Sequence, residues 1–147
     1  MPDIHLTVEI GRPPEVVFDL IADIPGYSRW LPSSGNYSGT VDVSESPVKL
    51  GTTYLDTNPV NRMNGEVTAY QPPARITFHQ ATPKPGMDVT VRYELSSTAE
   101  GTHLERTTSV RTGGVLRLLQ PIVVRRTRQE NQRTLAALKA YLEAQSP

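Results

Sequence analysis

The spacing of apolar residues changes once along this chain, at Gly113 and Gly114. Before these glycines apolar and polar residues alternate, most clearly over residues 87–96, and alternation is typical of a strand with one buried face. After them the apolar residues recur about every 3.6 positions, which is the period of an α-helix. A series of alternating segments followed by one long amphipathic helix predicts an α+β fold, with the helix packed on one face of an antiparallel sheet.

The elements are bounded by prolines, glycines and other turn-forming residues. Tandem prolines at 13 and 14 end the first strand and suit the first turn of a helix, where the missing N–H would have no partner. We expect strands at residues 4–10, 37–44, 52–57, 63–70, 75–81, 87–96 and 102–111, short helices at 15–22 and 27–31, and a long helix ending near residue 145.

The long helix has a single apolar stripe that passes through several polar residues. Pro121 lies near its start and predicts a kink or a break there. The stripe contains Leu116, Leu119, Val123, Thr127, Asn131, Thr134, Leu138 and either Tyr141 or Leu142.

Length and composition exclude several classes of protein. The 147 residues suit one domain spanning 1–147, and the 15 basic and 15 acidic residues balance, so bulk charge does not favour nucleic acid. The chain has no cysteine, which excludes disulfides, thiolate metal sites and a cysteine nucleophile. The sequence lacks a signal-peptide pattern and a long apolar run, so we expect a cytoplasmic protein with no membrane insertion.

The strand faces between residues 52 and 70 are ambiguous. Met63, Val67 and Ala69 share one face if the strand is regular. Tyr70 turns inward instead if a β-bulge intervenes.

Several short sequence segments, in their order and spacing, resemble those of the START-like (SRPBCC) superfamily, specifically its polyketide cyclase/dehydrase and lipid-transport branch. The resemblance covers nearly the whole chain. It rests on residues 14–23 (PEVVFDLIAD) with Tyr27 and 30–32 (WLP), on 48–52 (VKLGT), on 65–67 (GEV), 70–73 (YQPP) and 76–78 (ITF), and on Glu130, 134–135 (TL) and 138–143 (LKAYLE).

The resemblance implies a helix-grip fold: a curved seven-stranded antiparallel sheet around a long C-terminal helix, with two short helices after the first strand. It also implies an apolar ligand pocket between the sheet and that helix. From the strand faces and the helical stripe we predict as ligand-binding residues Trp30, Tyr54, Asp56, Met63, Phe78, Met87, Val89, Val91, Tyr93, Arg106, Thr108, Leu119, Val123 and Thr127.

Arg106 is the most informative of these residues. It shares the inward face of its strand with Leu104 and Val110, and arginine is almost never buried without a partner. It either anchors a carboxylate or carbonyl oxygen of the ligand, or belongs to an internal ion pair or reaches solvent at the sheet edge. Asp56 and Glu130 are its candidate partners.

Two other predicted features concern the pocket entrance. Trp30 and Leu31 either form a gate or pack beneath the short helices, and residues 58–64 form either a mobile flap or an ordinary polar loop.

The remaining polar residues do not suggest a metal or a cofactor. His5, His79 and His103 fall on the outward faces of their strands, and neither metal-ligand spacing nor a Gly-x-Ser-x-Gly motif is present. The basic run at 125–133 is interpreted as a solvated helix face, with docking to an anionic surface as the alternative.

These features leave three functions open. The first is a carrier or sensor that binds a lipid-like, aromatic or polyketide-like molecule. The second is a cyclase or dehydratase that uses the same cavity, and the third is a protein-interaction domain with a filled cavity. The sequence specifies neither the ligand, nor whether the protein is an enzyme, nor the oligomeric state.

Overall fold

The computed structural model describes residues 3–31, 39–41, 43–44, 48–57, 62–82 and 86–145. Within them the chain forms one antiparallel sheet, three short helices and one long helix. The elements are β1 (Asp3–Ile10), α1 (Pro14–Ala22), η1 (Ile24–Arg29), β2 (Gly39–Val41), β3 (Thr53–Thr57), β4 (Arg62–Gln71), β5 (Arg75–Thr82), β6 (Met87–Ser97), β7 (Thr102–Thr112), η2 (Gly114–Leu119) and α2 (Gln120–Ala144).

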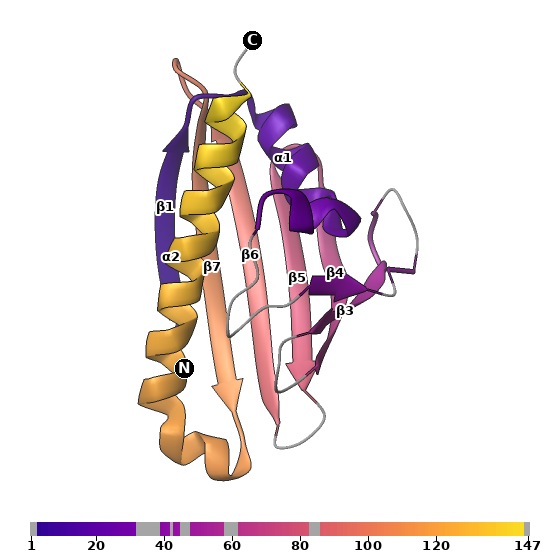
Figure 1. Ribbon diagram of the computed structural model, residues 1–147, viewed down its shortest axis with the longest axis vertical. Coiled ribbons are helices and arrows are strands. Elements are labelled where there is room, and N and C mark those ends of the chain that lie inside the picture. Colours follow the sequence, from indigo (N-terminus) through magenta and orange to yellow (C-terminus); the bar gives the residue numbers. More distant parts are fainter. Residues whose placement is uncertain are drawn as a thin grey trace.

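The sheet has the strand order β1-β7-β6-β5-β4-β3-β2. Six of these strands have at least five residues, whereas β2 has three. The helix α2 runs along one face of the curved sheet, and α1 and η1 cover the same face farther along (Figure 1). The α+β fold that the sequence predicted is therefore confirmed.

The short helices begin and end where the sequence predicted breaks. Pro14 occupies the first turn of α1, and Val17, Phe18 and Ile21 form its buried face. The second helical segment begins earlier than expected, because η1 is a 3₁₀-helix that starts at Ile24 and ends at Arg29.

The strand β4 contains the irregularity that the sequence left open. Its pairing with β5 shifts register between Val67 and Ala69, which is a β-bulge. Tyr70 consequently packs against the core, where its ring meets that of Phe18 edge to face at 5.6 Å between centroids.

Part of the expected β-region lies outside the described residues. Of the strand expected at 37–44, the structure describes β2 at Gly39–Val41 and the two residues Val43 and Ser44. Of the expected flap at 58–64, residues 58–61 lie outside the described part, and Arg62 already belongs to β4.

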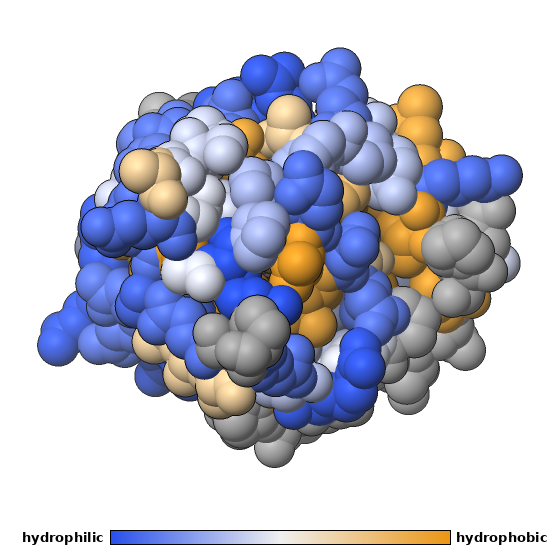
Figure 2. Space-filling view, turned by 90° about the horizontal axis from the view of Figure 1, so that it is seen from above, coloured by the Kyte–Doolittle hydropathy of each residue, from blue (hydrophilic) through white to orange (hydrophobic). Residues whose placement is uncertain are grey.

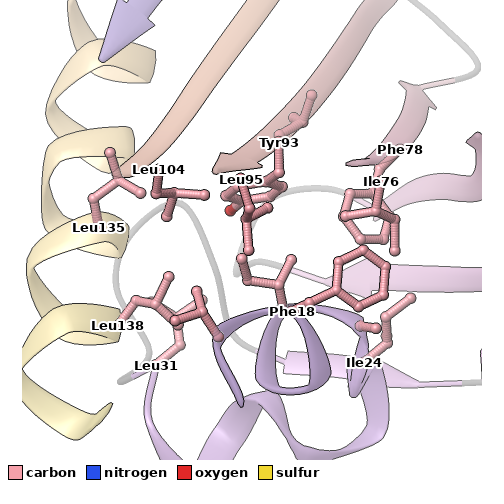
Figure 3. Close-up of a cluster of buried hydrophobic side chains, with 14 of the residues drawn as sticks. Phe18, Ile24, Leu31, Ile76, Phe78, Tyr93, Leu95, Leu104, Leu135 and Leu138 are labelled. Atoms are coloured by element: carbon pink, nitrogen blue, oxygen red, sulfur yellow. The ribbon is translucent and has the colours of Figure 1, made fainter. Parts of the chain in front are cut away.

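The apolar core lies between the sheet, α1 and the second half of α2. Figure 3 shows Phe18 of α1 among side chains of the central strands, with Leu135 and Leu138 of α2 on the other side of the cluster. The end of the molecule that carries the C-terminus is mostly hydrophilic on its surface, with small separate apolar patches (Figure 2).

The start of the long helix differs from the prediction. Pro121 lies in the first turn of α2, and the preceding residues form the separate 3₁₀-helix η2. The predicted break is confirmed, but the predicted stripe is wrong at Leu119, whose side chain is 47% exposed, because η2 does not continue the α-helical period.

The turn that follows β1 holds the C-terminal end of α2 through Gly11 and Arg12. Arg12 Nη1 donates to the carbonyl oxygens of Leu142 and Gln145 at 3.1 and 2.8 Å. The Glu143 carboxylate accepts from the Gly11 N–H at 2.9 Å and from Lys139 Nζ at 2.8 Å. The two Arg12 bonds satisfy carbonyl groups that a helix end leaves without intrahelical partners.

The described helices do not resemble membrane spans. None of them combines the length and apolar character needed to cross a bilayer.

Candidate ligand-binding site

A cavity of about 320 Å³ lies between the first half of α2, the segment of η1 and the concave face of the sheet. Twelve of the fourteen residues predicted from the sequence line it: Tyr54, Asp56, Met63, Phe78, Met87, Val89, Val91, Tyr93, Arg106, Thr108, Val123 and Thr127. Six of these residues come from β6 and β7, whose alternation puts every second side chain on the concave face.

The other two predicted residues do not line the cavity. Trp30 is buried and packs edge to face on Tyr27 at 5.1 Å between ring centroids, whereas Leu31, the other residue of the predicted entrance, lines the cavity. Leu119 belongs to η2 and faces solvent.

Arg106 reaches the cavity from β7, directly opposite Tyr93 of β6. Its Nη1 donates to the Tyr93 hydroxyl at 2.5 Å, and its Cζ lies 5.1 Å from the centroid of the Tyr93 ring. Within the described residues, its buried Nε has no hydrogen-bond partner. A buried donor without a partner is uncommon in proteins and marks a place where a ligand acceptor is favourable.

A second polar group involves β3 and β5. Gln80 Nε2 donates to the Tyr54 hydroxyl at 2.9 Å and to Asp56 Oδ2 at 2.7 Å. The sequence named Asp56 and Glu130 as candidate partners of Arg106 if Arg106 belonged to an internal ion pair. The structure instead gives Asp56 this bond from Gln80 and pairs Glu130 with Arg133.

Gly65 makes room for Tyr54. The two residues face each other across β3 and β4, and a Cβ on Gly65 would lie 2.3 Å from the Tyr54 ring. The absence of a side chain at this position therefore lets the ring lie close to the sheet and leaves the cavity open.

Two tyrosines at the cavity are held in their neutral form. Burial raises the pKa of Tyr27 and of Tyr54 above the usual value of 10.0, and the nearby Asp56 carboxylate raises that of Tyr54 further. The Tyr27 hydroxyl donates to the carbonyl oxygen of Ile21. Both phenols are consequently hydrogen-bonding groups at neutral pH and not bases.

The α2 side of the cavity is more polar than the sheet side. Asn131 Nδ2 donates to the Thr108 hydroxyl at 2.9 Å, and this buried bond joins α2 to β7. The Thr127 and Thr134 hydroxyls donate to backbone carbonyls of their own helix.

Eight lining residues were not among the predicted site residues. Gln80 could have been found, because it shares the inward face of its strand with Phe78, and Asn131 and Thr134 lie on the predicted helical stripe. The complete set is Ile24, Tyr27, Leu31, Gln80, Arg126, Glu130, Asn131 and Thr134.

The three histidines lie on the opposite, outer face of the sheet, as predicted. His79 pairs with Asp88 at 2.8 Å, and His103 pairs with Glu9, which raises the His103 pKa above its usual value of 6.5. They are remote from the cavity and contribute to surface ion pairs.

A curved sheet closed by one long helix over an apolar cavity defines a helix-grip domain. Residues 1–143 match the family described as polyketide cyclase / dehydrase and lipid transport, and the chain belongs to this family. No curated protein matches the chain.

Solved structures share this fold at low sequence identity. Protein MLL2253 from Mesorhizobium loti is 14% identical with a TM-score of 0.79, and the match covers 99% of this chain and 100% of that one. The Aha1 dimer from Colwellia psychrerythraea is 18% identical with a TM-score of 0.69 and 97% coverage of both chains. DynU16, from the dynemicin biosynthetic locus, is 18% identical with a TM-score of 0.72, and the match covers 99% of this chain but 48% of DynU16.

Proposed function

We propose that this protein binds a small, mostly apolar molecule that carries one anionic or carbonyl oxygen, and that Arg106 binds this oxygen. The observation that carries the proposal is the buried Arg106 Nε, which has no hydrogen-bond partner within the described residues. A guanidinium held in place by Tyr93 is suited to an oxygen acceptor, because its planar donors are already oriented.

The other walls of the cavity fit an apolar or aromatic ligand. Phe78 is edge to face with both Tyr54 and Tyr93, at 6.1 and 6.2 Å between ring centroids, so three aromatic rings line the sheet side. Ligand pockets are mostly apolar with a few placed polar groups and have volumes of about 300–1,000 Å³. A cavity of about 320 Å³ favours a compact ligand and weighs against a domain that fills its cavity with its own side chains.

The test combines native mass spectrometry with a pair of matched variants. Mass spectrometry of the purified protein looks for a co-purified small molecule. Calorimetric titration then compares pairs of aromatic or fatty carboxylates with their uncharged alcohols. We expect Arg106→Leu to weaken acid binding by roughly 10-fold or more, because a charge-assisted hydrogen bond is worth about 1.5–3 kcal/mol, while alcohol binding changes little.

The control is Arg111→Leu, which removes the same charge from the exposed, outward position of the same strand. Equal affinities of the Arg106 variant and the parent for every acid would overturn the assignment of Arg106. Absence of any bound ligand across the panel would overturn the binding function itself.

A second function, catalysis of a cyclisation or dehydration, is favoured by the group of Tyr54, Asp56 and Gln80. These polar residues converge on the same cavity as Arg106, and a positioned acid or donor can polarise a carbonyl group. Incubating the recovered ligand with ligand-free protein, followed by chromatography and mass spectrometry, distinguishes the two functions. A new product that Asp56→Asn abolishes indicates an enzyme, and unchanged ligand indicates a carrier.

A further inference from the structure

Three large apolar side chains are exposed together where η2 meets α2. Leu118 is 84% exposed, Leu119 47% and Ile122 53%. They belong to η2 and the first turn of α2, and the start of α2 is at the lower end of the molecule in Figure 1, away from the C-terminus. Isolated exposed apolar residues are ordinary, but three within five positions form a local surface of a kind that proteins use for contacts.

The same segment is strongly basic in a chain with balanced charge. Between Glu105 and Glu130 the sequence has no acidic residue, and it has six arginines: Arg106, Arg111, Arg117, Arg125, Arg126 and Arg128. All but Arg106 are exposed. An apolar surface bordered by arginines complements a surface that combines negative charge with accessible hydrocarbon.

The helical period places exposed residues and cavity-lining residues on different sides of this segment. Ile122 and Arg125 lie on the outer side of α2, whereas Val123 and Thr127 line the cavity. Arg126 lies on the boundary, because it is exposed and also lines the cavity. The exposed apolar surface therefore lies on the same helical turns as the cavity wall formed by Val123 and Thr127.

We propose that the outer surface of η2 and the first turns of α2, formed by Leu118, Leu119, Ile122 and the neighbouring arginines, docks on an anionic lipid bilayer. The leucines and the isoleucine enter the boundary between head groups and acyl chains, and the arginines contact the acidic head groups. This proposal is independent of the proposed ligand binding, since docking requires no molecule in the cavity. An uncharged partner surface would not explain the exposed arginines of η2 and the first turns of α2, which are Arg117, Arg125, Arg126 and Arg128. A polyanion such as nucleic acid would not explain the exposed aliphatic side chains.

The test is flotation of the full chain with vesicles, without added ligand. One set contains phosphatidylcholine alone, and the other contains equal parts of phosphatidylcholine and phosphatidylglycerol. We expect binding to the anionic vesicles only, and a large loss of binding when salt rises from about 0.1 M to about 1 M, because the Debye length falls from about 10 Å to about 3 Å.

Two pairs of variants separate the apolar from the basic contribution. Leu118→Ser with Ile122→Ser should abolish flotation, whereas Leu50→Ser, at an exposed leucine (61%) between β2 and β3, should leave it unchanged. Arg117→Gln with Arg125→Gln should lower the partition coefficient roughly 10- to 30-fold at low salt. The control pair Arg75→Gln and Arg92→Gln, which removes the same charge from the outer face of the sheet, should have a much smaller effect.

Three results would overturn the proposal. The first is no flotation with anionic vesicles at low salt, and the second is equal loss of flotation in the control variants. The third is self-association of the parent protein, seen by light scattering, that Ile122→Ser abolishes, because the surface would then bind a second copy. Ligand titration of the same variants is independent of these outcomes, so failure of docking leaves the cavity assignment intact.

Discussion

The two halves of α2 have the same helical period but different surroundings. In the second half Leu135, Leu138 and Leu142 are buried against the sheet and α1, and Arg12 and Glu143 hold the helix end. In the first half the inward residues are Val123 and Thr127, which are only half-buried because they face a cavity.

The two halves of α2 therefore have separate roles: one stabilises the fold, and the other leaves a space open. The packed half supplies apolar burial and a polar anchor, so the other half stays in position without close contact to the sheet. Asn131 marks the boundary, since its buried bond to Thr108 joins α2 to β7 at this point. Regions with few buried apolar contacts open at lower free energy, so we expect ligand entry at the first half.

The largest expected effect distinguishes the two halves directly. Leu138 is 0% exposed, and Leu138→Ala should lower the free energy of unfolding by about 2–5 kcal/mol, because it removes buried methyl groups and leaves a void. Val123→Ala should cost less than about 1 kcal/mol, because its side chain already faces empty space.

Urea denaturation of both variants measures this difference. Similar losses in the two variants would contradict the division of α2 into a packed and an open half. An unchanged dependence on urea concentration would show that the variants unfold with the same cooperativity as the parent.

A smaller effect on stability is expected when a methyl group is added beside the cavity. Gly65→Ala puts a methyl group where the Tyr54 ring lies, and the ring has to move into the cavity and away from Gln80. We expect a loss of about 1–3 kcal/mol in stability and weaker binding of any ligand that fills the parent cavity. Unfolding and ligand titration measure the two quantities.

Gly86→Ala is the matched control, since its added Cβ would meet nothing within 4 Å. If Gly65→Ala bound ligands as the parent does, the close approach of Tyr54 to the sheet would not be what keeps the cavity open.

The fold and most of the cavity were predictable from the sequence because both depend on periodicity. Alternation in β6 and β7 places Val89, Val91 and Arg106 on the concave face, and a single helical stripe identifies the inner side of α2. The predictions that failed depend on local irregularities. Leu119 was assigned to the stripe, but the 3₁₀ geometry of η2 changes the direction of its side chain.

The partners of the polar groups were less predictable than their positions. Asp56 and Glu130 were the candidate protein partners of Arg106, but Tyr93 lies directly opposite it in the hairpin register and accepts its hydrogen bond. Gln80 was not considered a site residue, although its strand face was readable. The Gln80 bonds to Tyr54 and Asp56 join β5 to β3, which are not consecutive in the chain, and the pattern of a single strand does not determine the distance between them.

The smallest expected effect tests the anchor of the packed half. A carboxylate in the last turn of a helix is unfavourable beside the negative end of the helix dipole. Glu143 is nevertheless ionised readily there, because Lys139 and the Gly11 N–H lower its pKa below the usual 4.5. A lowered pKa in the folded state means that the ionised form stabilises the protein above the pKa of the unfolded chain. That contribution is lost as pH falls through the lowered value.

Glu143→Gln should therefore be slightly less stable than the parent at pH 7, and the difference should vanish at strongly acidic pH. Thermal unfolding across this range measures it, with Glu100→Gln in the exposed β6–β7 turn as the control. A difference that persisted unchanged in acid would mean that the side chain, and not its charge, anchors the end of α2.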